Sequence, residues 1–462
     1  MALLDRLPRN LFTARGWGML ASGAAALGAA AIMGRRDLLG LAILLLVLPL
    51  VSLAGIRLAK PRFQVYREFN PSPVETAAPT TVRLAVSRKD AGSARATMEE
   101  HLPARFGESP AFHFPARSAT GGTSRYEYHL RSRQRGQFRI GPVMAEFTDA
   151  FGLSMHRHAI DDGDLLTVTP AAVVLPATGL AGARGNDGVT ATRIRANPSD
   201  DDVMTREYRL GDPMRRVHWA ATARHGDLMV RQEESVTTPE ATVIFDIRSL
   251  AHSPGNGPAP TGRGRRDGNA ILTTETFEWA VVAVMSIAAH LTERKYGLRL
   301  LDARGEPAFL TSPSAPEPEV EDYTGSSGLQ SIAESLAAIG LAGGGHRGPV
   351  ESAAPPFDDH LMDKLSGHRM RGPLIAVLGT ISAEEAVSLA PAAGFGTNAF
   401  ALIVAEKPGE YAGVLETLRR GGWRAAAVAP ATPVGNAWSG FDEDVVALAP
   451  SPTARQRNGV LQ

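Results

Sequence analysis

The chain has 462 residues, and its 48 basic and 48 acidic side chains give a formal net charge of zero. This balance provides no bulk electrostatic attraction to nucleic acid, and the length allows two or three domains with cores of their own. Cysteine is absent, which excludes disulfides, thiolate zinc sites and a cysteine nucleophile.

Two apolar runs near the N-terminus predict a pair of transmembrane helices. Residues 16–33 carry no charged side chain, and residues 38–58 carry only Arg57. Each run has about the ~20 residues that a helix needs to cross the hydrocarbon core, and residues 34–37 form a connection short enough to enforce a hairpin. A cleaved signal peptide is the alternative, but the second span follows at once and no small-residue cleavage site separates the two.

Basic residues around the spans favour an orientation with both chain termini in the cytoplasm. Three arginines precede the first span and four basic residues follow the second, against Arg35 and Arg36 in the connecting loop. We therefore expect a multi-pass protein of the inner (cytoplasmic) membrane. Its parts would be a cytoplasmic N-terminus at residues 1–15, two helices within residues 16–60, and soluble domains in the cytoplasm.

The next part of the chain, residues 61–176, predicts a β-sandwich. Apolar and polar residues alternate at 82–86 and 126–130, and further candidate strands follow. Regularly spaced strands with few helical stretches are typical of a sandwich, and the length fits an immunoglobulin-like module. His156 and His158 would share one face of a strand, but no third ligand is near them, so we expect no metal site there.

A run of charged and aromatic residues lies within a linker that we expect at residues 177–235. Residues 207–224 fit no common catalytic template, and they must either pair their charges internally or offer them to a partner. A tight turn is predicted at residues 211–213. A short helix would follow at residues 215–224 and bury the ring of Trp219.

Internal pairing of this run would make it an interdomain clasp that docks on the last domain. Forked bonds from arginines to the carboxylates of Glu207 and Asp212 would satisfy its charges. A surface for a partner or an anion is one alternative, and catalysis by an Asp212–His218 acid–base pair, which lacks a nucleophile, is another. The candidate residues for the clasp or the partner surface are Glu207, Tyr208, Gly211, Asp212, Arg215, Arg216, His218, Trp219, Arg224 and Arg231.

Three motifs in this order resemble the domain-of-unknown-function family 58. They are residues 135–142 (RGQFRIGP), residues 149–153 (DAFGL), and the run at residues 207–224 with its continuation at residues 227–234. The resemblance implies a membrane-anchored protein in which a sandwich precedes a von Willebrand factor A-like domain. It also implies association with MoxR-type AAA+ ATPases and transglutaminase-like membrane proteins, in envelope-linked assembly or maturation. It implies no enzymatic activity.

Residues 236–450 predict an α/β domain built on a doubly wound sheet. Apolar strands alternate with helices, which is typical of a parallel sheet with helices on both faces. A ligand of such a sheet binds beyond the carboxyl ends of the strands. The predicted strands are residues 242–247, 298–301, 374–378, 399–404 and 423–428, and the predicted helices are residues 274–294, 329–341, 382–389 and 411–420.

The metal site that the resemblance implies for this domain is expected to be lost. A von Willebrand-type site needs an Asp-x-Ser-x-Ser loop after the first strand, but Arg248 and Leu250 stand at the serine positions after Asp246. Too few oxygen ligands remain for Mg²⁺. We expect Arg248 to form a salt bridge with Asp246 in place of the ion, and we expect no metal and no other cofactor.

Three stretches of the last domain predict disordered inserts because they are rich in Gly and Pro: residues 251–269, 312–327 and 342–356. The tail at residues 451–462 is expected to be flexible.

Two spans, two domains of a kind that binds other proteins, and no coherent active site predict a membrane-anchored, non-enzymatic adaptor or scaffold. A MoxR-type AAA+ ATPase is the partner that the resemblance suggests. The alternatives are an enzyme that uses the central Asp/Arg/His motif and an extracellular adhesion-type module.

Overall fold

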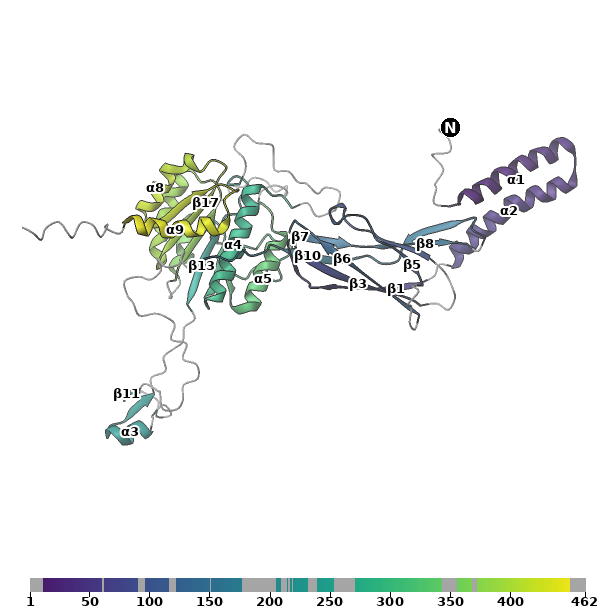
Figure 1. Ribbon diagram of the computed structural model, residues 1–462. Coiled ribbons are helices and arrows are strands. Elements are labelled where there is room, and N and C mark those ends of the chain that lie inside the picture. Colours follow the sequence, from purple (N-terminus) through teal and green to yellow (C-terminus); the bar gives the residue numbers. More distant parts are fainter. Residues whose placement is uncertain are drawn as a thin grey trace, which may run out of the picture.

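The computed structural model describes residues 11–59, 62–89, 96–115, 122–149, 151–176, 205–208, 214, 217, 219–231, 239–252, 271–342, 355–367 and 372–448. In chain order these residues form a pair of helices, a β domain, a short segment of three elements, and an α/β domain (Figure 1). Most of the predicted linker, the predicted tail, and most of the first and third predicted inserts lie outside the described residues.

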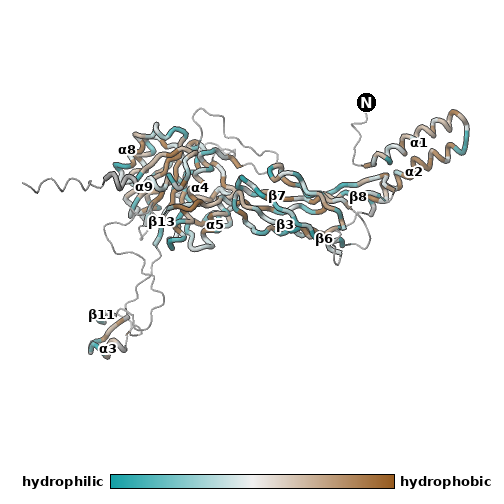
Figure 2. Tube along the Cα trace, viewed as in Figure 1, coloured by the Kyte–Doolittle hydropathy of each residue, from teal (hydrophilic) through white to brown (hydrophobic). Residues whose placement is uncertain are grey.

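The two N-terminal helices confirm the expectation of two long apolar segments. Helix α1 (Ala14–Met33) and helix α2 (Arg36–Ala59) are each long and apolar enough to cross a membrane. Gly34 makes the turn between them with a left-handed φ of 69°, and its N–H donates to the carbonyl of Ala30. Figure 2 shows that hydrophilic residues gather at this turn while both helices are largely hydrophobic.

Close packing between the two helices occurs at Gly23. A Cβ at this position would lie 2.9 Å from Cγ of Leu46, so only glycine lets the helices approach so closely here. The small-residue pairs whose spacing suggests a packing face, Gly18/Ser22 and Ala24/Gly28, are exposed instead. So many residues of α1 are small that their spacing alone does not single out the buried face.

The β domain confirms the prediction of a strand-rich second part. Its strands pair in three sheets with the orders β1-β3-β6, β2-β10-β7 and β5-β4-β8-β9. The bounds are β1 Phe63–Asn70, β2 Val74–Glu75, β3 Pro79–Arg88, β4 Ala96–Glu100, β5 Ala111–Phe114, β6 Thr123–Arg131, β7 Gly136–Ile140, β8 Val143–Thr148, β9 Met155–Ala159 and β10 Asp164–Thr169, with a 3₁₀ turn at Ala104–Phe106.

Strand β3 shows how the three sheets share one interior. Val82, Leu84 and Val86 alternate with more exposed residues, so they point to the same side of the strand. Val82 packs with residues of β7 and β10, whereas Leu84 and Val86 pack with residues of β4, β5 and β8. The β1-β3-β6 sheet therefore covers both of the other sheets, which together form the second layer.

A short segment within the predicted linker contains β11 (Thr205–Glu207), α3 (Trp219–His225) and β12 (Met229–Arg231). β11 and β12 pair as antiparallel strands. The predicted helix is present, but it begins at Trp219 rather than at residue 215. Trp219 is 66% exposed, so the predicted burial of its ring was wrong.

The α/β domain is built on one six-stranded sheet with the order β15-β14-β13-β16-β17-β18. All neighbouring strands are parallel except β15, which is antiparallel to β14. The five predicted parallel strands are confirmed, whereas the short β15 was not anticipated. The bounds are β13 Glu240–Phe245, β14 Gly297–Leu301, β15 Asp322–Tyr323, β16 Leu374–Leu378, β17 Ala399–Val404 and β18 Trp423–Val428.

Helices cover both faces of this sheet, as predicted. Helices α4, α5 and α9 contribute to the apolar core on one face, and α6, α7 and α8 to the core on the other. The bounds are α4 Glu275–Glu293, α5 Gly325–Ala338, α6 Asp359–Ser366, α7 Ala383–Leu389, α8 Ala412–Arg420 and α9 Val434–Leu448, with 3₁₀ turns at Ala390–Phe395 and Pro408–Tyr411. The sequence patterns did not identify α6 and α9.

The second predicted insert, residues 312–327, is part of the packed domain. Ser312 and Ser314 are buried, and the Oγ of Ser312 donates to the carbonyl of Ser335 in α5 at 2.6 Å. The Oγ of Ser314 accepts from the N–H of Ala338 at 2.9 Å. The prediction of disorder here was wrong because serine hydroxyls bind the backbone of α5, a contact that composition does not reveal.

Polar and apolar contacts join the β domain to the α/β domain. Arg135, in the turn between β6 and β7, is buried and donates to Glu278 of α4 and to carbonyls at the end of α5. Leu175, which follows β10, belongs to the α/β core around Phe277. The two domains are therefore packed against each other rather than merely tethered.

Candidate functional site

The α/β sheet has its topological switch point between β13 and β16. The connection after β13 runs through α4 on one face, and the connection after β16 runs through α7 on the other. In open α/β sheets, the crevice at the carboxyl ends of two such strands is where ligands bind. Here residues 246–252, which we name the switch-point loop, and the turn after β16 lie at this position.

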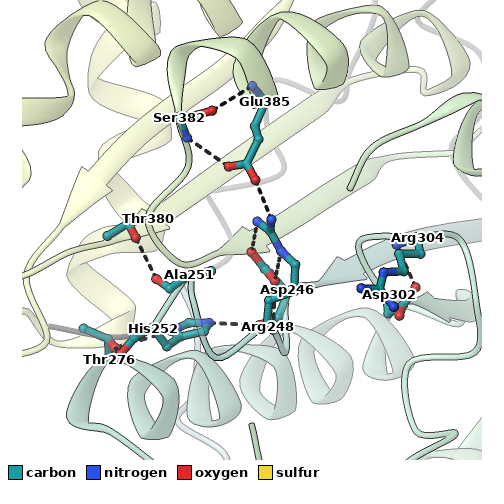
Figure 3. Close-up of polar contacts among 10 residues, drawn as sticks. All are labelled: Asp246, Arg248, Ala251, His252, Thr276, Asp302, Arg304, Thr380, Ser382 and Glu385. Carbon is teal, nitrogen blue, oxygen red and sulfur yellow. Dashed lines mark hydrogen bonds and ion pairs between the residues drawn. The ribbon is translucent and has the colours of Figure 1, made fainter. Parts of the chain in front are cut away.

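Asp246 is the first residue after β13, and both oxygens of its carboxylate accept hydrogen bonds from Arg248. The Nε and Nη2 atoms of Arg248 donate to the two carboxylate oxygens of Asp246, each at 2.8 Å (Figure 3). Asp246 is fully buried, so this forked pair satisfies a charge that water cannot reach. The salt bridge predicted between these residues is therefore present.

A second carboxylate completes the arrangement. The Nη1 atom of Arg248 donates to Oε1 of Glu385 at 2.6 Å. Glu385 is held by a capping box at the start of α7, in which its Oε2 accepts from the N–H of Ser382 and its own N–H donates to Ser382 Oγ. One guanidinium thus ties the loop after β13 to the helix after β16.

The electrostatics of this cluster keep Arg248 charged. Burial favours the neutral form of the guanidinium, but hydrogen bonds and charge attraction from Asp246, and then from Glu385, outweigh burial and raise the pKa of Arg248. Its guanidinium also lies 5.3 Å from the ring centre of Phe357, within the range of a cation–π contact.

The last two residues of the switch-point loop, Ala251 and His252, are buried. The N–H and Oγ1 of Thr380 both donate to the carbonyl of Ala251, at 2.7 and 2.9 Å. A Cβ at Gly379 would lie 2.3 Å from this carbonyl oxygen, so only glycine fits there. The Nε2 atom of His252 lies 2.9 Å from the carbonyl of Asp246, and burial lowers the pKa of His252. A carbonyl can only accept, so a neutral His252 carries its proton on Nε2.

Asp302, the first residue after β14, lies at the same edge of the sheet. Its Oδ1 accepts from the N–H groups of Arg304 and Glu306 at 2.8 and 2.9 Å, which orders the turn after β14. Burial raises the pKa of Asp302, although these hydrogen bonds oppose the shift.

An exposed apolar side chain lies in the same loop as this polar cluster. Leu250 is 85% exposed, although it lies between Ser249 and the buried Ala251. Val387, on the helix that carries Glu385, is also exposed. The carboxyl edge of the sheet thus combines a neutralised carboxylate with apolar groups that no described residue covers.

The chemical properties of the cluster favour a structural or binding role. Both oxygens of Asp246 are engaged by Arg248, so a hard cation would have to displace the guanidinium to reach them. Among the described residues, no group of three or more His, Cys, Asp or Glu side chains is arranged to hold a metal ion. His156 and His158 do lie on one face of β9, with ring centres 5.0 Å apart.

The predicted clasp residues are only partly described. Gly211, Asp212, Arg215, Arg216 and His218 lie outside the described residues. Of the others, Glu207 ends β11, Tyr208 follows it, Trp219 and Arg224 lie in α3, and Arg231 ends β12. Figure 1 shows β11 and α3 set apart from both larger domains. Docking of this segment on the last domain stays a prediction.

Sequence patterns missed the role of Glu385. The capping-box spacing from Ser382 to Glu385 was recognisable and correctly marks the start of a helix. The ion pair to Arg248 joins residues 137 positions apart, and it exists only because β13 and β16 are neighbours in the sheet.

We expect Arg248→Ala to lower the free energy of unfolding by about 1–3 kcal/mol, because buried Asp246 loses its counter-charge and its forked donors. Arg304→Ala is the matched control: Arg304 lies at the same edge and is exposed, so the change should be within about 0.5 kcal/mol. Chemical unfolding of the full chain in detergent measures both. Equal effects of the two variants would contradict a stabilising role for the Asp246–Arg248 pair.

The family model described as protein of unknown function DUF58 matches residues 204–253. The match supports the resemblance drawn from the motifs, over a short part of the chain. It begins just before β11, includes α3, β12 and β13, and ends at the switch-point loop. No match is found among curated proteins.

Proposed function

We propose that this chain is a membrane-anchored, non-enzymatic adaptor that binds a protein partner at the carboxyl edge of the α/β sheet. The supporting observation is that Arg248 neutralises the carboxylate of Asp246, while the neighbouring Leu250 is 85% exposed. A crevice meant for a small polar ligand would offer free polar groups. An exposed apolar side chain next to satisfied charges is better suited to protein binding.

The partner we propose is a MoxR-type AAA+ ATPase, with a transglutaminase-like membrane protein as a further member of the assembly. This part of the proposal rests on the family resemblance and on the match at residues 204–253, which includes the whole switch-point loop. The process it would serve is envelope-linked assembly or maturation.

Within this proposal the β domain is an immunoglobulin-like sandwich and the α/β domain is von Willebrand factor A-like with a degenerate metal position. The two-layer arrangement around β3 supports the first assignment. The doubly wound sheet, with Asp246 directly after its first strand, supports the second. Arg248 would then act as a permanent substitute for a metal ion.

Site-specific cross-linking tests the partner surface. A photoreactive amino acid at Leu250 should trap an AAA+ ATPase in native membranes, identified by mass spectrometry. The same group at Leu310, which is exposed on another loop of this domain, is the matched control and should not trap it. Repeated failure to recover any AAA+ ATPase from position 250, with or without nucleotide, would count decisively against the proposed partner.

The proposed topology has both soluble domains in the cytoplasm. Protease added to intact cells should then leave both domains uncleaved, and cleavage should begin only after the membrane is permeabilised. Cleavage in intact cells would instead favour an extracellular module and exclude a cytoplasmic ATPase as the partner.

A further inference from the structure

The loop between β8 and β9 joins the β domain directly to the first helix. We name residues 149 and 151–154 the junction loop. The N–H of Thr13 donates to the carbonyl of Leu153 at 3.0 Å, and the N–H of Met155 donates to the carbonyl of Leu11 at 3.1 Å. The residues just before α1 therefore extend the edge of the β5-β4-β8-β9 sheet. This pairing places the junction loop at the base of the hairpin.

The same loop also meets α2, at a level within its apolar run. The Oγ atoms of Ser52 and Ser154 lie 3.2 Å apart. Ser52 precedes Arg57 by five residues, which corresponds to ~7.5 Å along a helix. Arg57 marks the charged end of the apolar segment Arg36–Arg57. The junction loop therefore contacts α2 within its apolar segment, beyond the charged residue Arg57 that marks the end of that segment.

Contact with α1 is equally close. A Cβ at Gly16 would lie 2.0 Å from the carbonyl oxygen of Leu153, so the loop backbone packs directly on the helix backbone. Gly16 directly follows Arg15 and is the first residue of the uncharged run of α1. The loop therefore lies where the apolar run of α1 begins and where that of α2 ends.

Asp149 satisfies the backbone donors of the loop. Its Oδ1 accepts from the N–H groups of Leu153 and Ser154, both at 2.7 Å, and its Oδ2 accepts from the N–H of Phe151 at 3.0 Å. Burial disfavours the charged carboxylate, but hydrogen bonds from Ser52 and from these N–H groups outweigh it and lower the pKa of Asp149. Internal pairing of this kind is what backbone needs in order to lie in a region poor in water.

Aromatic side chains flank the loop. Phe12 is buried and its ring centre lies 5.4 Å from that of Trp17, edge to face. Phe151, in the junction loop, is instead 66% exposed. Exposure of a phenylalanine to water is unfavourable, whereas phenylalanine is among the apolar residues that interfacial segments bury at the boundary between headgroups and acyl chains.

We propose that the junction loop is a membrane-interface element, in which Phe151 inserts at the boundary between headgroups and acyl chains of the bilayer that α1 and α2 cross. The bilayer is favoured as the occupant because the loop is continuous with both apolar helices and has its polar groups paired internally. The inference rests on the proposed membrane anchoring. It adds that the β domain is held against the membrane surface at a defined depth.

A spin label placed at this position tests the proposal. The chain has no cysteine, so Phe151→Cys gives a unique labelling site in the full chain. Two matched exposed positions calibrate the measurement: Leu44→Cys in the middle of α2 (59% exposed) and Val387→Cys in the α/β domain (62% exposed). The labelled proteins are reconstituted in phospholipid nanodiscs, and collision rates with oxygen and with a water-soluble nickel chelate are compared.

We expect the oxygen-to-nickel ratio at position 151 to be several-fold higher than at position 387 and to approach that at position 44. A ratio at 151 equal to that at 387, with position 44 in lipid, would overturn the membrane-interface assignment while leaving the anchoring intact. Water-like ratios at all three positions would overturn both. Low collision rates with both reagents at 151 would indicate a protein surface over Phe151 and would also overturn the assignment.

Discussion

We expect Arg67→Ala to lower the free energy of unfolding of the β domain by about 3–5 kcal/mol, because it leaves a buried carboxylate without its counter-charge. The guanidinium of Arg67 is enclosed by three carboxylates. Its Nε donates to Glu100 at 2.5 Å, its Nη1 to Asp164 at 2.6 Å and its Nη2 to Asp161 at 3.0 Å. Glu100 is fully buried, and its only other side-chain donor among the described residues is Tyr128.

Arg83→Ala is the matched control for this prediction. Arg83 lies on a neighbouring strand and pairs with Glu127 at 3.6 Å, but both side chains are mostly exposed. Solvent screening and side-chain entropy limit such a pair to about 0–1 kcal/mol. Chemical unfolding of the full chain in detergent, followed by near-ultraviolet circular dichroism, measures both variants. A loss below about 1 kcal/mol for Arg67→Ala would show that the buried network does not stabilise the domain.

Removing the side chain of Arg135 should uncouple the β domain from the α/β domain at a cost of about 2–5 kcal/mol. Arg135 donates to both carboxylate oxygens of Glu278 at 2.9 Å and to the carbonyls of Leu336 and Ile339 at 2.7 Å. These acceptors belong to α4 and to the end of α5, so the truncation leaves unpaired groups on both. In calorimetry we expect the transition of the wild-type chain to separate into two, one for each domain.

The matched control is Arg133→Ala, two residues earlier in the same turn. Arg133 is exposed, so its removal should leave the unfolding transition unchanged within about 0.5 kcal/mol. Arg135→Lys keeps the charge but loses the forked geometry and should be intermediate. If Arg135→Ala still unfolds as the wild type does, apolar packing around Leu175 holds the two domains together without this arginine.

These contacts describe a continuous path from the membrane to the proposed partner surface. The junction loop pairs the hairpin with the β domain, and Arg135 pairs the β domain with the start of α4. Thr276, in the first turn of α4, lies 3.4 Å from His252 of the switch-point loop through its Oγ1. In the proposed adaptor, a partner bound near Leu250 would therefore be held at a set position relative to the bilayer rather than on a free tether.

Local chemistry explains which parts of this arrangement were predictable. Patterns within about 5–25 neighbouring residues were enough to predict three features. These are the apolar runs of α1 and α2, the alternation in β3, and the continuous apolar strands of the last sheet. The Asp246–Arg248 pair was also predictable, because Arg248 is only two residues from Asp246 in the loop that follows the strand. The 312–327 stretch was mispredicted because its order depends on contacts with α5.

The amino-acid sequence was therefore sufficient to predict the order of the parts, the class of each domain and the salt bridge between Asp246 and Arg248. It could not assign Glu385 to Arg248, Arg67 to Glu100, or Arg135 to Glu278, and it could not place the DAFGL motif against the base of the hairpin. Each of these contacts joins residues that are 33 to 143 positions apart in the chain. Such a contact requires two separately formed elements to pack together, so only the tertiary structure decides which charges meet.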